Sequence, residues 1–408
     1  MRLKTNASPV LFAGLIVLLS MIGQTARPAV PGDPPSDPAE ALLAAIPPPL
    51  PKDASRPLVG AIRWDAWSGG TVTKVVEQTL GPAKYHHRLP WFAEVKGDKQ
   101  VAIFGGRQII MDMEIAWAAY AGLDYWAFLL YPEDSPMSVS LARYLQSPRR
   151  KQIRFCLILH NALGAPDDQW PREQARLIKL LKEPGYQTVL DGRPLVFEFS
   201  AVERAVERKR FDGLREAVRN AGLNPYYVFM GWNPEADWRR QSGNGFDAVS
   251  HYARASGSAR DYASLVRETE EYFWRRAAEA RVPYIPLVTT GWNKEPRKDH
   301  PVPWEKDAAY LKQTEFIPSP APDEIAAHLR RGLAFVRKNA EICPARALVV
   351  YAWNEHDEGG WLAPTWTPEG RPNSARLDAV RRALISGETQ SDSAGPRRTT
   401  VHAAGKPR

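Results

Sequence analysis

The 408-residue sequence predicts a (β/α)8 TIM barrel, a fold of the α/β class. Eight short apolar runs, rich in Val, Ile, Leu, Phe or Tyr, are each bounded by polar or turn residues, as strands are. Amphipathic helical patterns separate most of these runs. Strand–helix alternation repeated eight times indicates a parallel sheet, and eight such units close naturally into a barrel.

A doubly wound open sheet is the alternative fold. The stretch that follows the first apolar run, "RWDAWSGG", lacks the glycine spacing of a dinucleotide or P-loop site, which weakens the case for nucleotide chemistry. No cofactor is therefore expected.

The eight predicted strands come in regular order along the chain. They occupy residues 57–64, 123–131, 153–161, 194–200, 226–232, 246–252, 284–292 and 347–355. Between them lie helical patterns such as "REQARLIKLLKE" and "PDEIAAHLRRGLAFVRKNAE". The connection near 233–245 is short, and its sequence gives only weak support for a helix.

The two ends of the chain differ from the predicted barrel, which spans residues 57–385. In residues 1–26, Arg2 and Lys4 precede the apolar stretch "VLFAGLIVLLSMI", which is too short for a comfortable membrane span. This pattern predicts a signal peptide and a secreted or periplasmic protein, with an uncleaved membrane anchor as the alternative. Residues 27–56 are proline-rich and are expected to form a linker without helix or strand. Residues 386–408 are expected to be a disordered tail.

The charge and the cysteines exclude several classes of function. The net charge is +8, but residues 1–26 and 386–408 each contribute +2, and the predicted barrel has no dense basic run. Nucleic-acid binding is therefore not expected. Cys156 and Cys343 are the only cysteines. They allow a single disulfide but neither a disulfide framework nor a zinc cluster, and no metal site is expected.

Polar and aromatic residues gather where the predicted strands end, which is where the active sites of this fold are built. Flat aromatic rings suit the apolar faces of sugars, and carboxylates and amides suit their hydroxyl edges. Any one of these residues, taken alone, could instead be a core group or a helix cap. The candidate substrate-binding residues are Trp64, Asp65, Trp67, Tyr131, His160, Asn161, Trp232, Trp292, Asn293, Asn354, His356 and Trp361.

The last predicted strand runs directly into the acidic segment "NEHDEGG". Its Glu355 and Glu358 are three residues apart, so they share a face if the chain makes a helical turn. Two close carboxyl groups repel when both are ionised, which raises one pKa and suits the acid–carboxylate pair of a glycosidase. The alternatives are a charged surface loop, or a metal site formed by His356, Asp357 and Glu358. The metal site is disfavoured because adjacent side chains point in different directions.

The segment "YAWNEHDEGGWLAPT" resembles the closing motif of glycoside hydrolase family 99 and of the glycosyltransferase WbsX-like family, in which Asn-Glu-Trp-x-Glu-Gly precedes an aromatic residue and a proline. "MDMEIAWAAYAGLDYWAFLLY", "GYQTVLDGRPLVFEFS" and "TTGWNKEPR" resemble other family segments in the same order. The resemblance covers most of residues 57–385. It implies a (β/α)8 barrel.

Family 99 comprises endo-acting α-mannosidases. The resemblance to this family implies that Glu358 is the general acid/base. Glu355 would then assist through the sugar 2-hydroxyl. His356 and Asp357 depart from the family pattern, so mannose specificity does not transfer. Glu198, at the end of the fourth predicted strand, is an alternative acid.

The sequence therefore predicts an exported glycoside hydrolase that acts on a polysaccharide or other glycan through Glu355 and Glu358. A glycosyltransferase-like protein of polysaccharide biosynthesis is one alternative, although no phosphate-cradling loop is visible. A carbohydrate-binding barrel without catalysis is the other.

Overall fold

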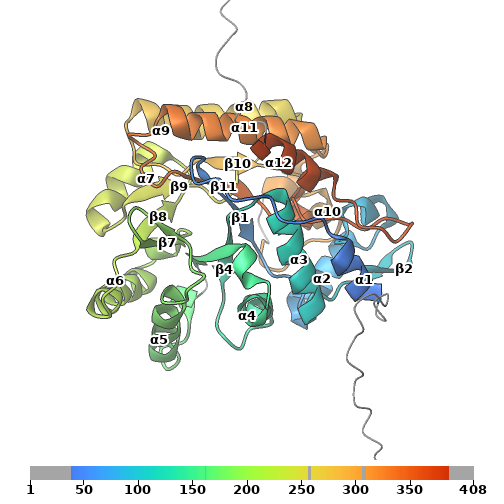
Figure 1. Cartoon of the computed structure of the whole chain (residues 1–408), viewed down its shortest axis with the longest axis horizontal. Coiled ribbons are helices and arrows are strands. Elements are labelled where there is room, and N and C mark those ends of the chain that lie inside the picture. The colour runs from blue at the N-terminus through green and yellow to red at the C-terminus, as the bar shows by residue number, and fades with distance from the viewer. Residues whose placement is uncertain (1–37, 161, 256–258, 306–308, 386–408) are drawn as a thin grey trace, which may run out of the picture.

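Eight parallel strands form the centre of the molecule, which is known from a computed structural model that describes residues 38–160, 162–255, 259–305 and 309–385 (Figure 1). Their hydrogen-bonded order is β10–β11–β1–β4–β5–β7–β8–β9. Val249 of β9 also pairs in parallel with Tyr284, just before β10, and so closes the ring. The predicted (β/α)8 barrel is confirmed. The strands are β1 (Leu58–Arg63), β4 (Tyr125–Leu130), β5 (Arg154–Leu159), β7 (Arg193–Glu198), β8 (Tyr226–Met230), β9 (Ala248–Ser250), β10 (Leu287–Thr289) and β11 (Ala347–Tyr351).

Helices surround the strands (Figure 1). Long α11 lies along one side with α8 and α9, and α5 and α6 cover the region of β7 and β8. The C-terminal helix α12 packs against α11 and α3. The helices are α2 (Gly70–Leu80), α3 (Gln108–Ala121), α4 (Val139–Gln146), α5 (Trp170–Leu181), α6 (Ala205–Asn220), α7 (Pro234–Gln241), α8 (Tyr262–Thr269), α9 (Arg276–Glu279), α10 (Glu295–Asp299), α11 (Pro322–Lys338) and α12 (Ala375–Ile385).

Each of the eight predicted strands is present but shorter than its apolar run. The last residues of the runs leave the sheet and build the loops at its rim. The weakly supported helix near 233–245 does form, as α7. Asn233 caps it, because its side-chain oxygen accepts a hydrogen bond of 3.1 Å from the backbone N–H of Ala236, and Pro234 occupies the first turn.

The expectation that residues 27–56 hold no helix is wrong for α1 (Pro38–Ala45). Its sequence, "PAEALLAA", combines strong helix formers with a proline in the first turn, where proline is tolerated. Leu50 then donates a backbone hydrogen bond of 3.0 Å to Ala119 of α3, beside which α1 lies (Figure 1). Arg56 is buried against Asp124 at 2.6 Å. Residues 38–56 are therefore part of the folded body.

The predicted signal peptide and tail lie outside the described residues. Within the described ranges, no helix has the length and apolar character needed to cross a membrane.

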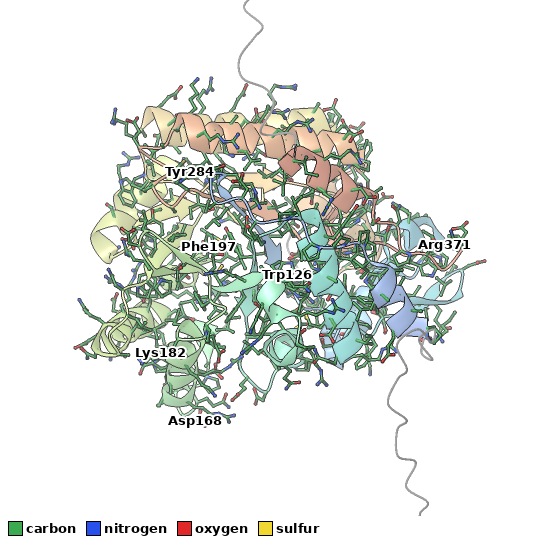
Figure 2. All side chains as sticks on the ribbon, in the orientation of Figure 1. Trp126, Asp168, Lys182, Phe197, Tyr284 and Arg371 are labelled. Atoms are coloured by element: carbon green, nitrogen blue, oxygen red, sulfur yellow. The ribbon has the colours of Figure 1, made fainter. Side chains whose placement is uncertain are left out.

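The core fills the barrel and the space between barrel and helices. Trp126, Phe197 and Tyr284 lie among the central elements in Figure 2, whereas Asp168, Lys182 and Arg371 lie at the periphery. Cys156 and Cys343 are both buried and free, so the disulfide that the sequence allowed is not formed.

Two fully buried histidines, one directly after β9 and one in α11, pack against the same helical turn. His251 stacks on Phe273 with ring centroids 3.5 Å apart, and His328 stacks on Trp274 at 5.1 Å. Phe273 and Trp274 sit side by side in a π-helical turn, Glu270–Arg275, between α8 and α9. Burial lowers the pKa of each imidazole to about 3.

These histidines predict acid sensitivity. Their folded pKa lies below the unfolded value of 6.5, so their contribution to stability is complete above pH 6.5 and is lost as pH falls toward 3. Each should steepen the decline in unfolding free energy by about 1 kcal/mol per pH unit between pH 6 and 5. Denaturant titrations of the wild type and His251→Phe over this range measure the slope. Equal slopes for the two proteins would contradict the assignment.

Candidate functional site

A cavity of about 430 Å³ opens where the barrel strands end. Five of the residues predicted for the site line it, namely Trp64, Tyr131, His160, Glu355 and Glu358. The other lining residues are Val72, Leu129, Met137, Phe199, Tyr252, Arg297, Trp304 and Glu305. Aromatic rings, carboxyl groups and a guanidinium therefore line the same open cavity.

A tight turn after β11 brings the two glutamates to this cavity. The short strands β12 (Asn354–Glu355) and β13 (Gly360–Trp361) pair antiparallel, and a 3-10 turn, His356–Glu358, joins them. Gly359 follows with φ 84°, and a Cβ atom there would lie 2.6 Å from the backbone nitrogen of Asn293. Only glycine fits both the backbone angle and the close approach. The segment is therefore a built turn rather than a charged surface loop.

Glu358 is held as an anion. Its Oε1 accepts one hydrogen bond from the guanidinium of Arg297 and lies 2.9 Å from Nζ of Lys294, while its Oε2 accepts from the hydroxyl of Tyr351. Burial opposes ionisation of this carboxyl group, but the two cations outweigh burial and lower its pKa to about 2.

Glu355 has the opposite environment. Burial, followed by the negative charge of Glu358, raises its pKa well above the usual value of 4.5. The Tyr252 hydroxyl donates to Oε1 at 2.6 Å, and Oε2 has no hydrogen-bond partner among the described residues. This environment favours the protonated form of Glu355, and Oε2 is the oxygen available to carry the proton.

The order of the two pKa values is thus the opposite of what the family resemblance implies for the proton donor. The resemblance makes Glu358 the proton donor, whereas the cations around Glu358 keep it ionised and leave the proton on Glu355.

Arg297 organises the charged floor of the site. It binds Asp357 through two nitrogens, at 2.7 and 3.0 Å, and also contacts Glu358. Glu305 accepts from Arg297 at 2.9 Å and from Lys294 at 2.8 Å, so Glu305 and Glu358 share the same two cations. Three carboxylates against two cations leave this cluster with a formal charge of −1.

His160 adds a neutral acceptor to the cavity wall. Its Nδ1 lies 2.6 Å from the carbonyl oxygen of Phe199, to which it donates, so the other ring nitrogen is an acceptor. Burial lowers the pKa of the imidazole and favours this neutral form. On the same wall, Nε1 of Trp64 donates to the hydroxyl of Tyr131 at 2.9 Å.

Two asparagines predicted to belong to the site bind backbone groups with their side chains and do not line the cavity. The side-chain oxygen of Asn354 accepts from the backbone N–H of Trp64 at 2.9 Å, which ties β12 to the end of β1. Asn293 donates from its side chain to the carbonyl of Ile317 at 2.8 Å. Both are buried, and both fix the loops that carry the site.

His356, Trp67 and Trp361 pack together behind the turn. The His356 ring lies 4.8 Å from that of Trp67 and is stacked on Trp361 at 5.4 Å, and its Nδ1 contacts the carbonyl of Arg88. These three residues support the turn from outside the cavity.

The described residues contain no cluster of His, Cys, Asp and Glu that could hold a metal ion, and the neighbours His356, Asp357 and Glu358 point to different partners.

Three further predicted site residues, Asp65, Trp292 and Trp232, also lie outside the cavity lining. Asp65 pairs with buried Arg63 at 2.9 Å. Trp292 packs on Tyr351 with ring centroids 5.7 Å apart. Trp232 borders a separate depression, and Asn161 lies outside the described residues.

Glu198, the alternative acid, does not line the cavity either. It is fully buried, and its Oε1 accepts from the backbone N–H groups of Ala201 and Val202 at 2.6 and 3.1 Å. Burial raises its pKa to about 8. Its place in the fold is to hold the loop after β7.

Sequence reasoning missed several residues of the site. Lys294 and Arg297 come just after a predicted strand end, in "TTGWNKEPR", so the strand-end rule extended by one helical turn would have found them. Tyr252 ends the predicted strand 246–252 but is not among the predicted site residues. Nothing in the sequence singled out Trp304 and Glu305, which lie in a loop after α10.

No family model and no curated protein sequence matches the chain. Among solved structures, it is similar to the GH99 endo-α-mannosidase from Bacteroides thetaiotaomicron in complex with bis-tris propane. The TM-score is 0.55 at 12% identity over 81% of this chain and 96% of that chain. A second structure of that enzyme gives a TM-score of 0.50 at 12% identity over 81% and 97% of the two chains.

The chain has the fold of a GH99 glycoside hydrolase. Glycosidase-like architecture therefore agrees with the sequence motifs. At this identity the likeness establishes the fold alone.

The contrast between the two glutamates predicts opposite effects on stability. Glu355→Gln removes a group that stays protonated when folded but ionises above pH 4.5 when unfolded. This variant should therefore unfold at a higher temperature than the wild type, with a larger advantage at pH 7 than at pH 4.5. Thermal melts at the two pH values measure this difference.

Glu358→Gln is the matched control, because it removes the buried carboxylate that contacts both Arg297 and Lys294. It should lose about 3–5 kcal/mol of stability at pH 7. Similar melting temperatures for the two variants would contradict the opposite protonation states.

Proposed function

We propose that the protein is a glycoside hydrolase whose reacting pair is Glu355 and Glu358. The observation that carries the proposal is that two glutamates three residues apart border one cavity, with two cations against Glu358 and, among the described residues, none bonded to Glu355, so that their pKa values are shifted in opposite directions. Cleavage of a glycosidic bond needs one carboxyl group that carries a proton and one that is ionised.

In the proposed mechanism, Glu355 donates its proton to the oxygen of the glycosidic bond, and the leaving sugar departs as an alcohol. As this bond breaks, positive charge develops on the remaining sugar ring, and a water molecule adds to its anomeric carbon. The proton that this water loses restores the acid form of Glu355. The Glu358 carboxylate, in a cluster of formal charge −1, stabilises that charge through space. Arg297, Lys294 and Tyr351 keep Glu358 fixed and ionised while the proton moves.

Carbohydrate is the proposed ligand class, because the cavity combines exposed aromatic faces with acids and a neutral histidine. The name of the structural neighbour makes α-linked manno-oligosaccharides the first probes. The departures at His356 and Asp357 from the family motif argue for testing other glycans beside them. Export through the N-terminal signal remains part of the proposal.

A carbohydrate-binding barrel without catalysis is the second candidate. It is favoured by one observation, namely that both carboxyl oxygens of Glu358 already have partners. Appearance of new reducing ends when the wild type is incubated with a glycan panel separates the two candidates.

The roles of the two glutamates can be tested with leaving groups of different acidity. Glu355→Gln and Glu358→Gln should each lower turnover of natural glycans by about 10²–10⁴-fold. If Glu355 is the proton donor, its variant should recover activity on aryl glycosides with acidic phenols, which leave without protonation. Glu358→Gln should not recover. Turnover on both substrate types is the measurement.

Glu198→Gln provides the matched control for this experiment. It makes the same substitution at a buried glutamate outside the cavity and retains the oxygen that accepts from Ala201 and Val202, so turnover should stay near the wild-type value. Rescue of Glu358→Gln instead of Glu355→Gln would reverse the roles. Wild-type rates in both variants would refute the pair.

A further inference from the structure

Trp232 is an exposed indole on a rigid segment of the barrel rim. Trp232 follows β8 in the chain, and 55% of the residue is exposed. The backbone N–H groups of Trp232 and Asn233 both donate to one oxygen of Asp237, at 2.8 and 2.7 Å. A Cβ atom on Gly231 would lie 2.2 Å from that oxygen, so glycine is required there. The fold thus fixes the backbone while leaving the ring in solvent.

An aromatic path connects this ring to the reaction cavity. Tyr252, which donates to Glu355, stacks on Phe199 with centroids 4.6 Å apart and planes within 15°. Phe199 lines the cavity and lies 6.0 Å from Trp232. The hydroxyl of Ser200 donates to the carbonyl of Met230 at 3.0 Å, which ties the loop of Phe199 to the end of β8.

Polar side chains surround the exposed indole. Trp232 borders a depression of about 450 Å³ that also contains Glu203 and Arg240, paired at 3.0 Å. A flat apolar ring beside hydrogen-bonding groups matches a sugar, which has a C–H face and hydroxyl edges. Rigid aromatic platforms lose little conformational entropy on binding, which suits them to recognition.

We infer that Trp232 is a sugar-binding platform outside the reaction cavity and that the ligand is an oligosaccharide chain that reaches both places. The inference rests on the carbohydrate ligand proposed above. One sugar unit occupies the cavity beside Glu355 and Glu358. A further unit of the same chain stacks on Trp232, with Phe199 between the two positions.

The test compares the binding of long and short sugars by two proteins, one with Trp232→Ala and one with Trp232 intact. Both proteins carry Glu358→Gln so that the ligand is not cleaved. The probes are hexasaccharides and disaccharides of α-mannan, β-glucan and xylan, measured by calorimetry. Trp232→Ala should weaken hexasaccharide binding roughly two- to tenfold, as expected for one aromatic stacking contact, and leave disaccharide binding unchanged. Trp232→Phe should restore part of the loss.

Tyr272→Ala is the matched control, because Tyr272 is 48% exposed but sits on the π-helical turn between α8 and α9. It should bind every probe as the wild type does. Equal hexasaccharide binding by Trp232→Ala and the wild type, equal losses for both chain lengths, or no binding of any hexasaccharide would overturn the inference. Trp232-dependent binding of hexasaccharides that the active protein does not cleave would support the platform and refute the hydrolase.

Discussion

Arg297 is the residue on which the site depends. Only 1% of it is exposed, so its charge is stable only if carboxylates replace the lost water. Asp357 does so through two hydrogen bonds, and Glu358 and Glu305 add one contact each. Because Arg297 belongs to α10, whereas Asp357 and Glu358 belong to the turn after β11, this network fixes two rim loops against each other.

The network also makes two neighbouring glutamates chemically different. Glu355 and Glu358 are both buried and belong to the same turn, so burial alone would raise the pKa of both. Arg297 and Lys294 contact Glu358 directly and lower its pKa, whereas at Glu355 burial and the negative charge of Glu358 outweigh the weaker influence of Arg297. The asymmetry is therefore imposed from α10 and not by the turn itself. It is what makes acid–base chemistry at this cavity physically reasonable.

Local patterns in the sequence were sufficient to predict the barrel and the glutamate pair. Alternation of apolar strands with amphipathic helices is a short-range property, and an acidic segment directly after a core strand marks the rim. The pairing of Glu358 with Arg297, 61 residues away, depends on how loops fold over the rim, which no periodicity encodes. Trp292 does not line the cavity for a related reason, because β10 ends at Thr289 and the indole packs on Tyr351. Asp65 sits at a strand end as predicted, but its neighbour Arg63 neutralises it.

The most direct test of this account is infrared spectroscopy of the two glutamates at pH 7. Difference spectra between the wild type and each glutamine variant show whether the lost group was a protonated carboxyl or a carboxylate. The account predicts that Glu355→Gln removes a protonated-carboxyl band and that Glu358→Gln removes a carboxylate band. Loss of a carboxylate band from Glu355→Gln, or of a protonated-carboxyl band from Glu358→Gln, would contradict it.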